Sequence, residues 1–201
     1  MTRNEWLPDA AGWCAAAERV ISPNQDARPA GMPLELLVIH NISLPAGQFG
    51  TPHVSALFCN QLDCSADPSF AGLQGLTVSS HFLIARDGRV TQFVPCLARA
   101  WHAGLSEWQG RSRCNDFSIG IELEGCDWLP FAAAQYDSLQ QLTAALLRAY
   151  PSLRAIAGHQ HIAPQRKTDP GPHFDWAAYR RALQHHNQEP LQWGDLPLPT
   201  K

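Results

Sequence analysis

A buried strand is predicted by the run Leu34-Glu35-Leu36-Leu37-Val38-Ile39-His40-Asn41. Its apolar side chains follow one another without the alternation of a half-exposed strand, which is typical of a strand covered on both faces. The run ends in two polar residues, so His40 and Asn41 stand where the strand leaves the sheet. Because functional groups are often presented on loops held by a rigid sheet edge, His40 is a candidate site residue.

A β-hairpin is predicted by residues 80–86 and 89–94. Branched and aromatic side chains fill both segments, and Asp87-Gly88 joins them as a pair that tolerates the positive φ of a tight turn. Between the first strand and this hairpin, residues 43–76 are rich in Pro, Gly, Ser and Asp, with one short helix expected across 54–62. A connection of this length exceeds what packing requires, so we expect a functional loop.

Alternating side chains predict a further strand over residues 117–124. One face is expected to carry the apolar residues Phe117, Ile119, Ile121 and Leu123. The other face carries Glu122 and Glu124, about 7 Å apart because successive same-face residues in a strand have that spacing. Both carboxylates are therefore candidates for the same role.

Two helices are predicted in the C-terminal half. Apolar residues recur at helical spacing from 133 to 150, where Pro151 ends the segment. A second helix begins after Asp175, whose carboxylate is a suitable N-cap, and residues 189–201 form a proline-rich tail that we expect to be less ordered. A short apolar strand, 155–158, lies between the two helices. These helices are expected to cover the sheet.

Composition limits the classes of partner. A chain of 201 residues with 45% hydrophobic content suits one globular domain. Its formal charge of −3 and pI near 6.3 give no basic field for nucleic acid, which we do not expect as a partner. The first residues lack the pattern of a secretory signal, and no apolar run is long enough to cross a bilayer. A cytoplasmic protein without membrane contact is expected.

The six cysteines are expected to be free thiols. Without an export signal, a reduced state is favoured over a disulfide framework. None forms the Cys-x-x-Cys pair of a zinc ribbon or redox motif, so cysteine is not expected to bind a metal.

A loop rich in ionisable groups follows the strand at 155–158. It reads Gly158-His159-Gln160-His161-Ile162-Ala163-Pro164-Gln165-Arg166-Lys167-Thr168-Asp169-Pro170-Gly171-Pro172. A catalytic zinc site uses three nitrogen or oxygen ligands and leaves a fourth position for water, a need that His40, His159 and Asp169 fit. Spacing alone leaves four competing histidines, which are His53, His81, His161 and His173.

Five segments together resemble one enzyme family. They are Leu37-Val38-Ile39-His40-Asn41-Ile42-Ser43-Leu44-Pro45, Val78-Ser79-Ser80-His81-Phe82-Leu83-Ile84, Arg99-Ala100-Trp101-His102-Ala103-Gly104, Asn115-Asp116-Phe117-Ser118-Ile119-Gly120-Ile121-Glu122-Leu123-Glu124-Gly125, and the loop from His159 to Pro172. In this order they resemble the zinc-dependent N-acetylmuramoyl-L-alanine amidases, in particular the cytosolic enzymes of peptidoglycan recycling. The resemblance implies an α/β (α+β) fold like that of peptidoglycan recognition proteins, with a central mixed β-sheet flanked by helices. It implies one amidase domain over 1–201, with a catalytic core at about 30–186.

The resemblance also assigns roles in the reaction. It implies that Zn²⁺ is bound by His40, His159 and Asp169. Glu122 would be the acid/base carboxylate, with Glu124 as its rival on the same strand face, and Lys167 would stabilise the oxyanion.

Three further residues resemble family positions that contact substrate: Asn41, Trp101 and Arg113. His102 lies beside Trp101 and is interpreted as structural, with support of the metal site as the alternative. The chain departs from many relatives at His161, where they carry Asp, and at Thr77, where some carry a basic residue. Substrate preference is therefore less well determined than the reaction.

The expected protein is a monomeric cytosolic amidase acting on a small-molecule muropeptide. It would cut the amide between the lactyl group of 1,6-anhydro-N-acetylmuramic acid and L-alanine, and by resemblance would lower the muropeptides that induce β-lactamase in some bacteria. One alternative is a non-catalytic peptidoglycan-binding module, which is disfavoured because all three ligands are present. Another is an amidase of intact cell wall, which would need export.

Overall fold

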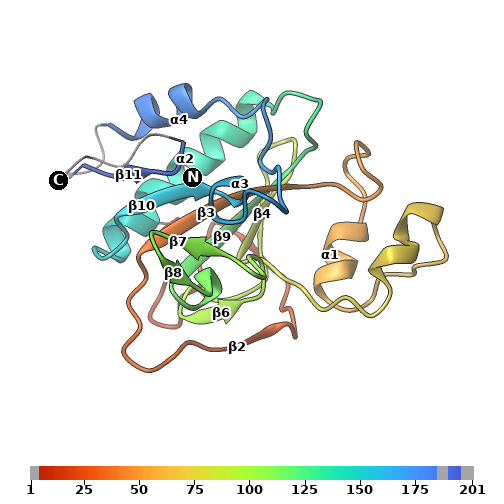
Figure 1. The fold of residues 1–201 in the computed structure, drawn as a ribbon, viewed down its shortest axis with the longest axis horizontal. Helices are drawn as coiled ribbons and strands as arrows, with labels where there is room; N and C mark the ends of the chain where they lie inside the picture. Colours follow the sequence, from red (N-terminus) through yellow and green to blue (C-terminus); the bar gives the residue numbers. More distant parts are fainter. Residues whose placement is uncertain (1–4, 185–189, 196–201) are drawn as a thin grey trace.

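A seven-stranded mixed sheet forms the centre of the molecule in the computed structural model, which describes residues 5–184 and 190–195 (Figure 1). The strand order is β1-β5-β4-β9-β3-β10-β11. Neighbouring strands are parallel except β4 and β5, which form the predicted antiparallel hairpin. The bounds are β1 Glu18–Arg19, β5 Val90–Gln92, β4 Phe82–Ile84, β9 Ser118–Glu124, β3 Leu36–Ile42, β10 Ala155–Gly158 and β11 Gln192–Trp193.

One face of the sheet is covered by helices α2 (Ala133–Ala149) and α4 (Trp176–Leu183). Leu37 and Ile39 of β3 are fully buried in the same apolar cluster as Leu142 and Leu146 of α2. The α2 residue Gln135 is also fully buried and donates from Nε2 to backbone carbonyls of β4 and β9, which attaches the start of the helix to the sheet.

The opposite face is covered by short elements and loops. These are the two-stranded sheets β2/β6 (Gln25–Ala27 and Ala98–Ala100) and β7/β8 (Glu107–Trp108 and Arg111–Ser112) and the 3₁₀ helix η2 (Cys114–Asp116). Helix α1 (His53–Phe58) and the 3₁₀ helix η1 (Pro68–Leu73) lie to one side of the sheet in Figure 1. Leu36 and Val38 of β3 pack on this side against Ala103 and Ile162. The central strand is therefore buried on both faces, as its continuous apolar run predicted.

The predicted helices and central strands are confirmed with bounds that differ by a few residues: β10 matches its predicted range, β3 extends to Ile42, and α1 begins at His53 and ends at Phe58. Asp175 is the N-cap of α4, where its carboxylate accepts from the Ala178 N–H, and Gly88 has the positive φ of +85° that the hairpin turn requires. Within the described residues, 5–184 and 190–195, none of the helices combines the length and apolar composition that crossing a bilayer requires.

Two expectations were wrong in detail. Phe117 does not share the apolar face of Ile119 and Ile121, because it lies before the first residue of β9 and packs on the opposite side of the sheet. The C-terminal tail is partly regular: β11 pairs with β10, and Asp195 forms an ion pair with Arg180 of α4. Trp193 packs against Tyr179, which explains how a short strand is held at the sheet edge. The rest of the tail, 196–201, lies outside the described residues.

Candidate metal centre

Parallel strand register brings the first two site residues together. His40 of β3 lies directly opposite Glu122 of β9, at corresponding positions of the two neighbouring strands. Strand β10 also runs parallel to β3 and leads directly into helix α3 (His159–Ile162), a short helix that the sequence did not predict. His159 therefore emerges beside His40, because parallel strands deliver their carboxyl ends to one edge of a sheet.

Three side chains converge at this edge into a group that can hold a metal ion. The Nδ1 atoms of His40 and His159 are 3.1 Å apart, and Asp169 Oδ2 lies 3.0 Å from the first and 3.1 Å from the second. Ligands about 2.0–2.1 Å from a tetrahedral zinc are about 3.3 Å from one another, so the triangle has nearly the required size. Among the nine histidines of the chain, His40 and His159 are the two that the described structure brings into this group, as predicted.

The protons on the two imidazoles also fit a cation. His159 Nε2 lies 3.1 Å from the carbonyl oxygen of Ala103, which can only accept, so Nε2 carries the hydrogen. In the neutral ring, Nδ1 then presents its lone pair toward His40 and Asp169. Burial, reinforced by the nearby His159, lowers the pKa of His40 to about 4, so this ring is neutral near pH 7. Converging lone pairs and a carboxylate oxygen form a suitable donor set for a divalent cation.

The third ligand is ionised. Burial alone would raise the pKa of Asp169, but hydrogen bonds with His159 and His40 outweigh it and hold the pKa well below its usual range. The site therefore supplies one ionised carboxylate oxygen and two imidazole nitrogens.

Glu122 lies beside the triad with unused hydrogen-bonding capacity. Its Oε1 is 4.0 Å from His40 Nδ1, and its buried Oε2 has no hydrogen-bond partner among the residues that the structure describes. Burial raises the pKa of Glu122 well above its ordinary value. The nearby Asp169 carboxylate adds to this rise, and the charge of Lys167 opposes it. A buried carboxyl with a raised pKa is suited to proton transfer near neutral pH.

Glu124, the rival carboxylate, is occupied elsewhere. It accepts hydrogen bonds from the backbone N–H groups of Gly50 and Arg86. These bonds attach the long loop after β3 and the β4/β5 turn to strand β9. Glu124 therefore attaches these two segments to β9. Strand periodicity alone could not distinguish this role from that of Glu122.

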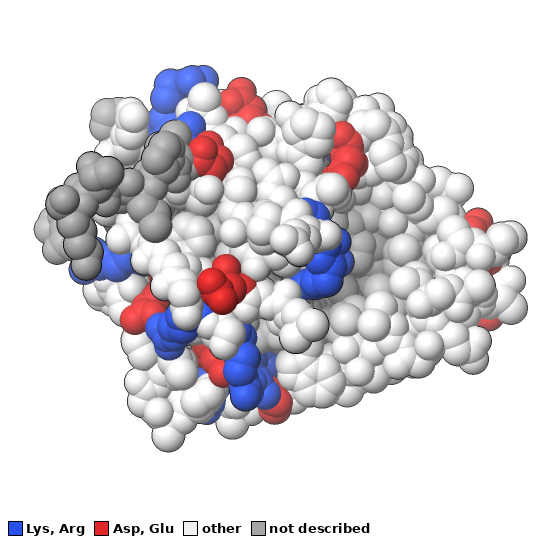
Figure 2. Space-filling view, in the orientation of Figure 1, with Lys and Arg blue, Asp and Glu red and all other residues white. Residues whose placement is uncertain are grey.

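A cavity of about 400 Å³ opens beside Asp169. Asn41 and Lys167 line it, together with residues that sequence reasoning did not select, among them Asp127 and Trp128. Asn41 donates from Nδ2 to Asp127 Oδ1 and to the Pro170 carbonyl, so it also attaches the backbone that follows Asp169. Figure 2 shows basic side chains bordering a hollow on one face of the molecule, with charges of both signs elsewhere.

The other two predicted substrate residues do not line this cavity. Trp101 follows β6 and is one of two residues, after Arg99, whose hydrogen bonds lower the pKa of Asp26. Arg113 has a left-handed φ of +62° and an ion pair with Asp116, and 70% of its side chain is exposed.

The competing histidines have other surroundings. His81 Nδ1 accepts from the Gly120 N–H, and His161 Nδ1 accepts from the Gly158 N–H. The ring of His53 packs on Phe70, and His173 is exposed. His161 therefore supplies an acceptor for the backbone N–H that precedes the candidate ligand His159.

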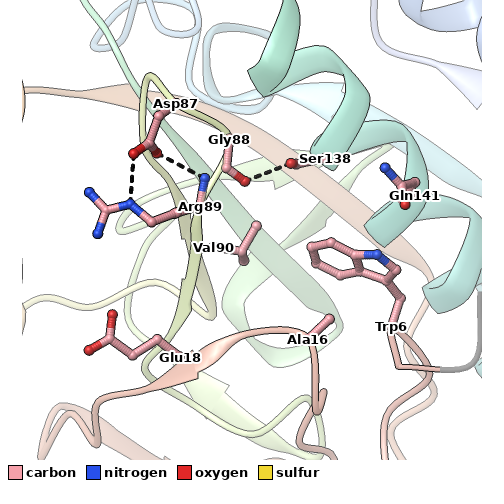
Figure 3. Close-up of a pocket in the computed structure, with 9 residues that line it drawn as sticks. All are labelled: Trp6, Ala16, Glu18, Asp87, Gly88, Arg89, Val90, Ser138 and Gln141. Atoms are coloured by element: carbon pink, nitrogen blue, oxygen red, sulfur yellow. Dashed lines mark hydrogen bonds and ion pairs between the residues drawn. The ribbon is translucent and has the colours of Figure 1, made fainter. Parts of the chain in front are cut away.

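A second cavity, of about 490 Å³, lies away from this chemistry (Figure 3). Trp6, Glu18, the hairpin turn and α2 line it, and the Gly88 carbonyl accepts from Ser138 at its edge. None of the three candidate ligands lines this second cavity. The candidate substrate site is therefore the cavity beside Asp169, although its volume is smaller.

Comparison with known proteins supports the same chemistry. The model of the N-acetylmuramoyl-L-alanine amidase family matches residues 30–172, well over half of the chain. The chain belongs to this family. The matched region of this amidase contains all three candidate ligands, Glu122 and Lys167.

Individual relatives agree with the family match. The amidase is 56% identical over 170 residues to the 1,6-anhydro-N-acetylmuramyl-L-alanine amidase AmpD of Citrobacter freundii, covering 84% of this chain and 91% of the relative. A crystal structure of selenomethionine AmpD superposes with a TM-score of 0.85 at 55% identity, covering 88% and 98% of the two chains. A complex of Escherichia coli AmiD with anhydro-N-acetylmuramic acid-L-Ala-D-γ-Glu-L-Lys has a TM-score of 0.57 at 33% identity, covering 77% and 59%. The amidase fold is that of these enzymes.

Proposed function

We propose that this amidase uses zinc to hydrolyse the amide between the lactyl group of 1,6-anhydro-N-acetylmuramic acid and the L-alanine of muropeptides. The observation that carries the proposal is the convergence of His40, His159 and Asp169 beside Glu122, whose Oε2 has no hydrogen-bond partner within the described structure. The choice of substrate is supported by the name of AmpD and by the muropeptide in the AmiD complex. We further propose that it acts as a monomer in the cytoplasm, in peptidoglycan recycling.

Each residue has a defined task in this reaction. When bound, zinc supplies a Lewis acid that makes water nucleophilic near neutral pH. Glu122 accepts the proton of the attacking water and later delivers it to the alanine nitrogen, which is a poor leaving group as an anion. Glu122 is buried, and within the described structure its Oε2 has no hydrogen-bond partner. This oxygen is therefore available to accept the proton of the attacking water.

Lys167 supplies the second cation. It lines the cavity beside Asp169. Its charge opposes the rise in the pKa of Glu122 and adds to the fall in the pKa of His40. We propose that it stabilises the oxyanion that forms as water attacks the carbonyl. Asn41 is proposed to contact substrate inside the cavity. Trp101 and Arg113, which do not line the cavity, are proposed to contact parts of the sugar and stem peptide that extend beyond it, with the exposed guanidinium of Arg113 suited to a peptide carboxylate.

Replacing Lys167 with methionine is expected to lower kcat by about 10²- to 10³-fold while zinc remains bound, because the charge that stabilises the oxyanion is removed from a pre-formed site. Steady-state kinetics on the muropeptide and metal analysis of the same sample measure the two effects. Arg89→Met removes an exposed cation of the hairpin and should leave kcat unchanged. Equal kcat values for the two variants would contradict the role of Lys167.

The proposed function is tested by incubating the protein with anhydro-N-acetylmuramyl tripeptide and following free tripeptide by mass spectrometry. Release should stop with chelator and return on addition of Zn²⁺. A parallel digest of intact peptidoglycan identifies the preferred substrate. Full zinc occupancy with no release from either substrate would instead indicate a binding module.

A further inference from the structure

Two consecutive residues contact the two candidate histidine ligands, each at the ring nitrogen that faces away from Asp169. His40 Nε2 lies 2.9 Å from His102 Nδ1, and His159 Nε2 lies 3.1 Å from the carbonyl oxygen of Ala103. We call His102 and Ala103 the 102–103 segment. Each imidazole thus has one nitrogen facing Asp169 and the other facing this segment.

Metal binding by His40 would determine which ring nitrogen carries the hydrogen in both His40 and His102. If His40 binds through the lone pair of Nδ1, the neutral ring carries its hydrogen on Nε2 and must donate it. His102 Nδ1 must then accept, so the hydrogen of His102 is on Nε2, which lies 3.2 Å from Ser118 Oγ. The result is a continuous chain in which His40 donates to His102 and His102 donates to Ser118.

The 102–103 segment is itself fixed by side chains. Asn115 Oδ1 accepts from the backbone N–H of His102 at 3.1 Å and from that of Ala103 at 2.8 Å. Arg166 donates to the Ala103 carbonyl at 2.8 Å, the same oxygen that accepts from His159. Gly120 allows the His102 ring to lie against β9, because a Cβ at this position would come within 2.5 Å of His102 Cγ.

The geometry points to the 102–103 segment as a shared brace that orients both metal-ligand imidazoles, with His102 and Asn115 as positioning residues. This inference rests on the proposed function only in that His40 and His159 bind the metal. The sequence favours a structural role for His102, with support of the metal site as the alternative; the position of its Nδ1 beside His40 favours the alternative. Partners behind metal-ligand histidines typically change metal affinity by about 10- to 100-fold when they are removed.

Two substitutions of His102 separate the acceptor from the packing. His102→Asn places Oδ1 close to the position of Nδ1 and so keeps the acceptor while losing the ring. His102→Phe keeps a ring and loses the acceptor. Zinc affinity is measured by competition with a chromophoric chelator, and thermal unfolding of the metal-free proteins checks the fold.

We expect His102→Phe to bind zinc about 10- to 100-fold more weakly than the parent, and His102→Asn to stay within about threefold. Equal affinity of His102→Phe and the parent, or a larger loss for His102→Asn than for His102→Phe, would overturn the inference in favour of packing alone.

A second pair tests the same inference without changing the segment. Asn115→Asp keeps an oxygen for the two N–H groups, whereas Asn115→Leu removes it at similar volume. The leucine variant should bind zinc more weakly than the aspartate variant, and equal affinities would count against the inference. If the parent protein binds no zinc, the proposed function itself fails; if the parent binds one zinc and all four variants bind equally tightly, only the brace is disproved.

Discussion

Replacing Asp169 with alanine is expected to abolish both metal binding and turnover. Its Oδ2 is the third corner of the triangle, 3.0 and 3.1 Å from the two imidazole nitrogens, and it supplies the negative charge of the ligand set. Two neutral nitrogens alone hold zinc weakly, and a Lewis acid contributes several kcal/mol to the transition state. We therefore expect zinc content near zero and a turnover lower by about 10³-fold or more.

Metal analysis by mass spectrometry and muropeptide kinetics on the same preparation measure both effects. Asp137→Ala removes a carboxylate from the exposed face of α2 and should retain zinc and activity. A zinc-loaded Asp169→Ala protein with the parent turnover would show that the metal, if it is needed, is bound elsewhere.

Replacing Glu122 with glutamine is expected to separate metal binding from catalysis. The amide has the shape of the carboxyl but cannot take a proton from water or return it to the leaving nitrogen. The three candidate ligand residues are unchanged, and His40 Nδ1 lies 4.0 Å from the carboxyl oxygen, beyond hydrogen-bond distance. Zinc should remain bound while kcat falls by about 10²- to 10⁴-fold.

Glu124→Gln is the matched control for this experiment. It makes the same chemical change two residues away on the same strand face, where the carboxylate accepts from Gly50 and Arg86. We expect a lower melting temperature from weaker loop attachment and a kcat within a few-fold of the parent. A larger kcat loss for Glu124→Gln than for Glu122→Gln would reverse the assignment of the two carboxylates.

The local elements follow from local patterns. The apolar run of β3, the Asp87-Gly88 turn, the helical spacing of α2 and the Asp175 cap act over a few residues, so the sequence predicts them directly. Strand β11 has no such signal. It exists because an open edge of β10 and the aromatic surface of α4 accept it, and both are products of the assembled sheet.

In the candidate site, too, some features follow from the sequence alone and others only from the tertiary structure. The chemical types of the ligands and of Glu122 were recognisable from family-like motifs, since reactivity belongs to the side chain. Three features depend on contacts between segments far apart in sequence: which atom of each residue faces the candidate metal position, which of the two same-face glutamates is bound to loop backbone, and that residues 102 and 103 contact both imidazoles. His40 and His159 are separated by 119 positions and meet at 3.1 Å because β3 and β10 are parallel neighbours, a pairing that no local pattern encodes.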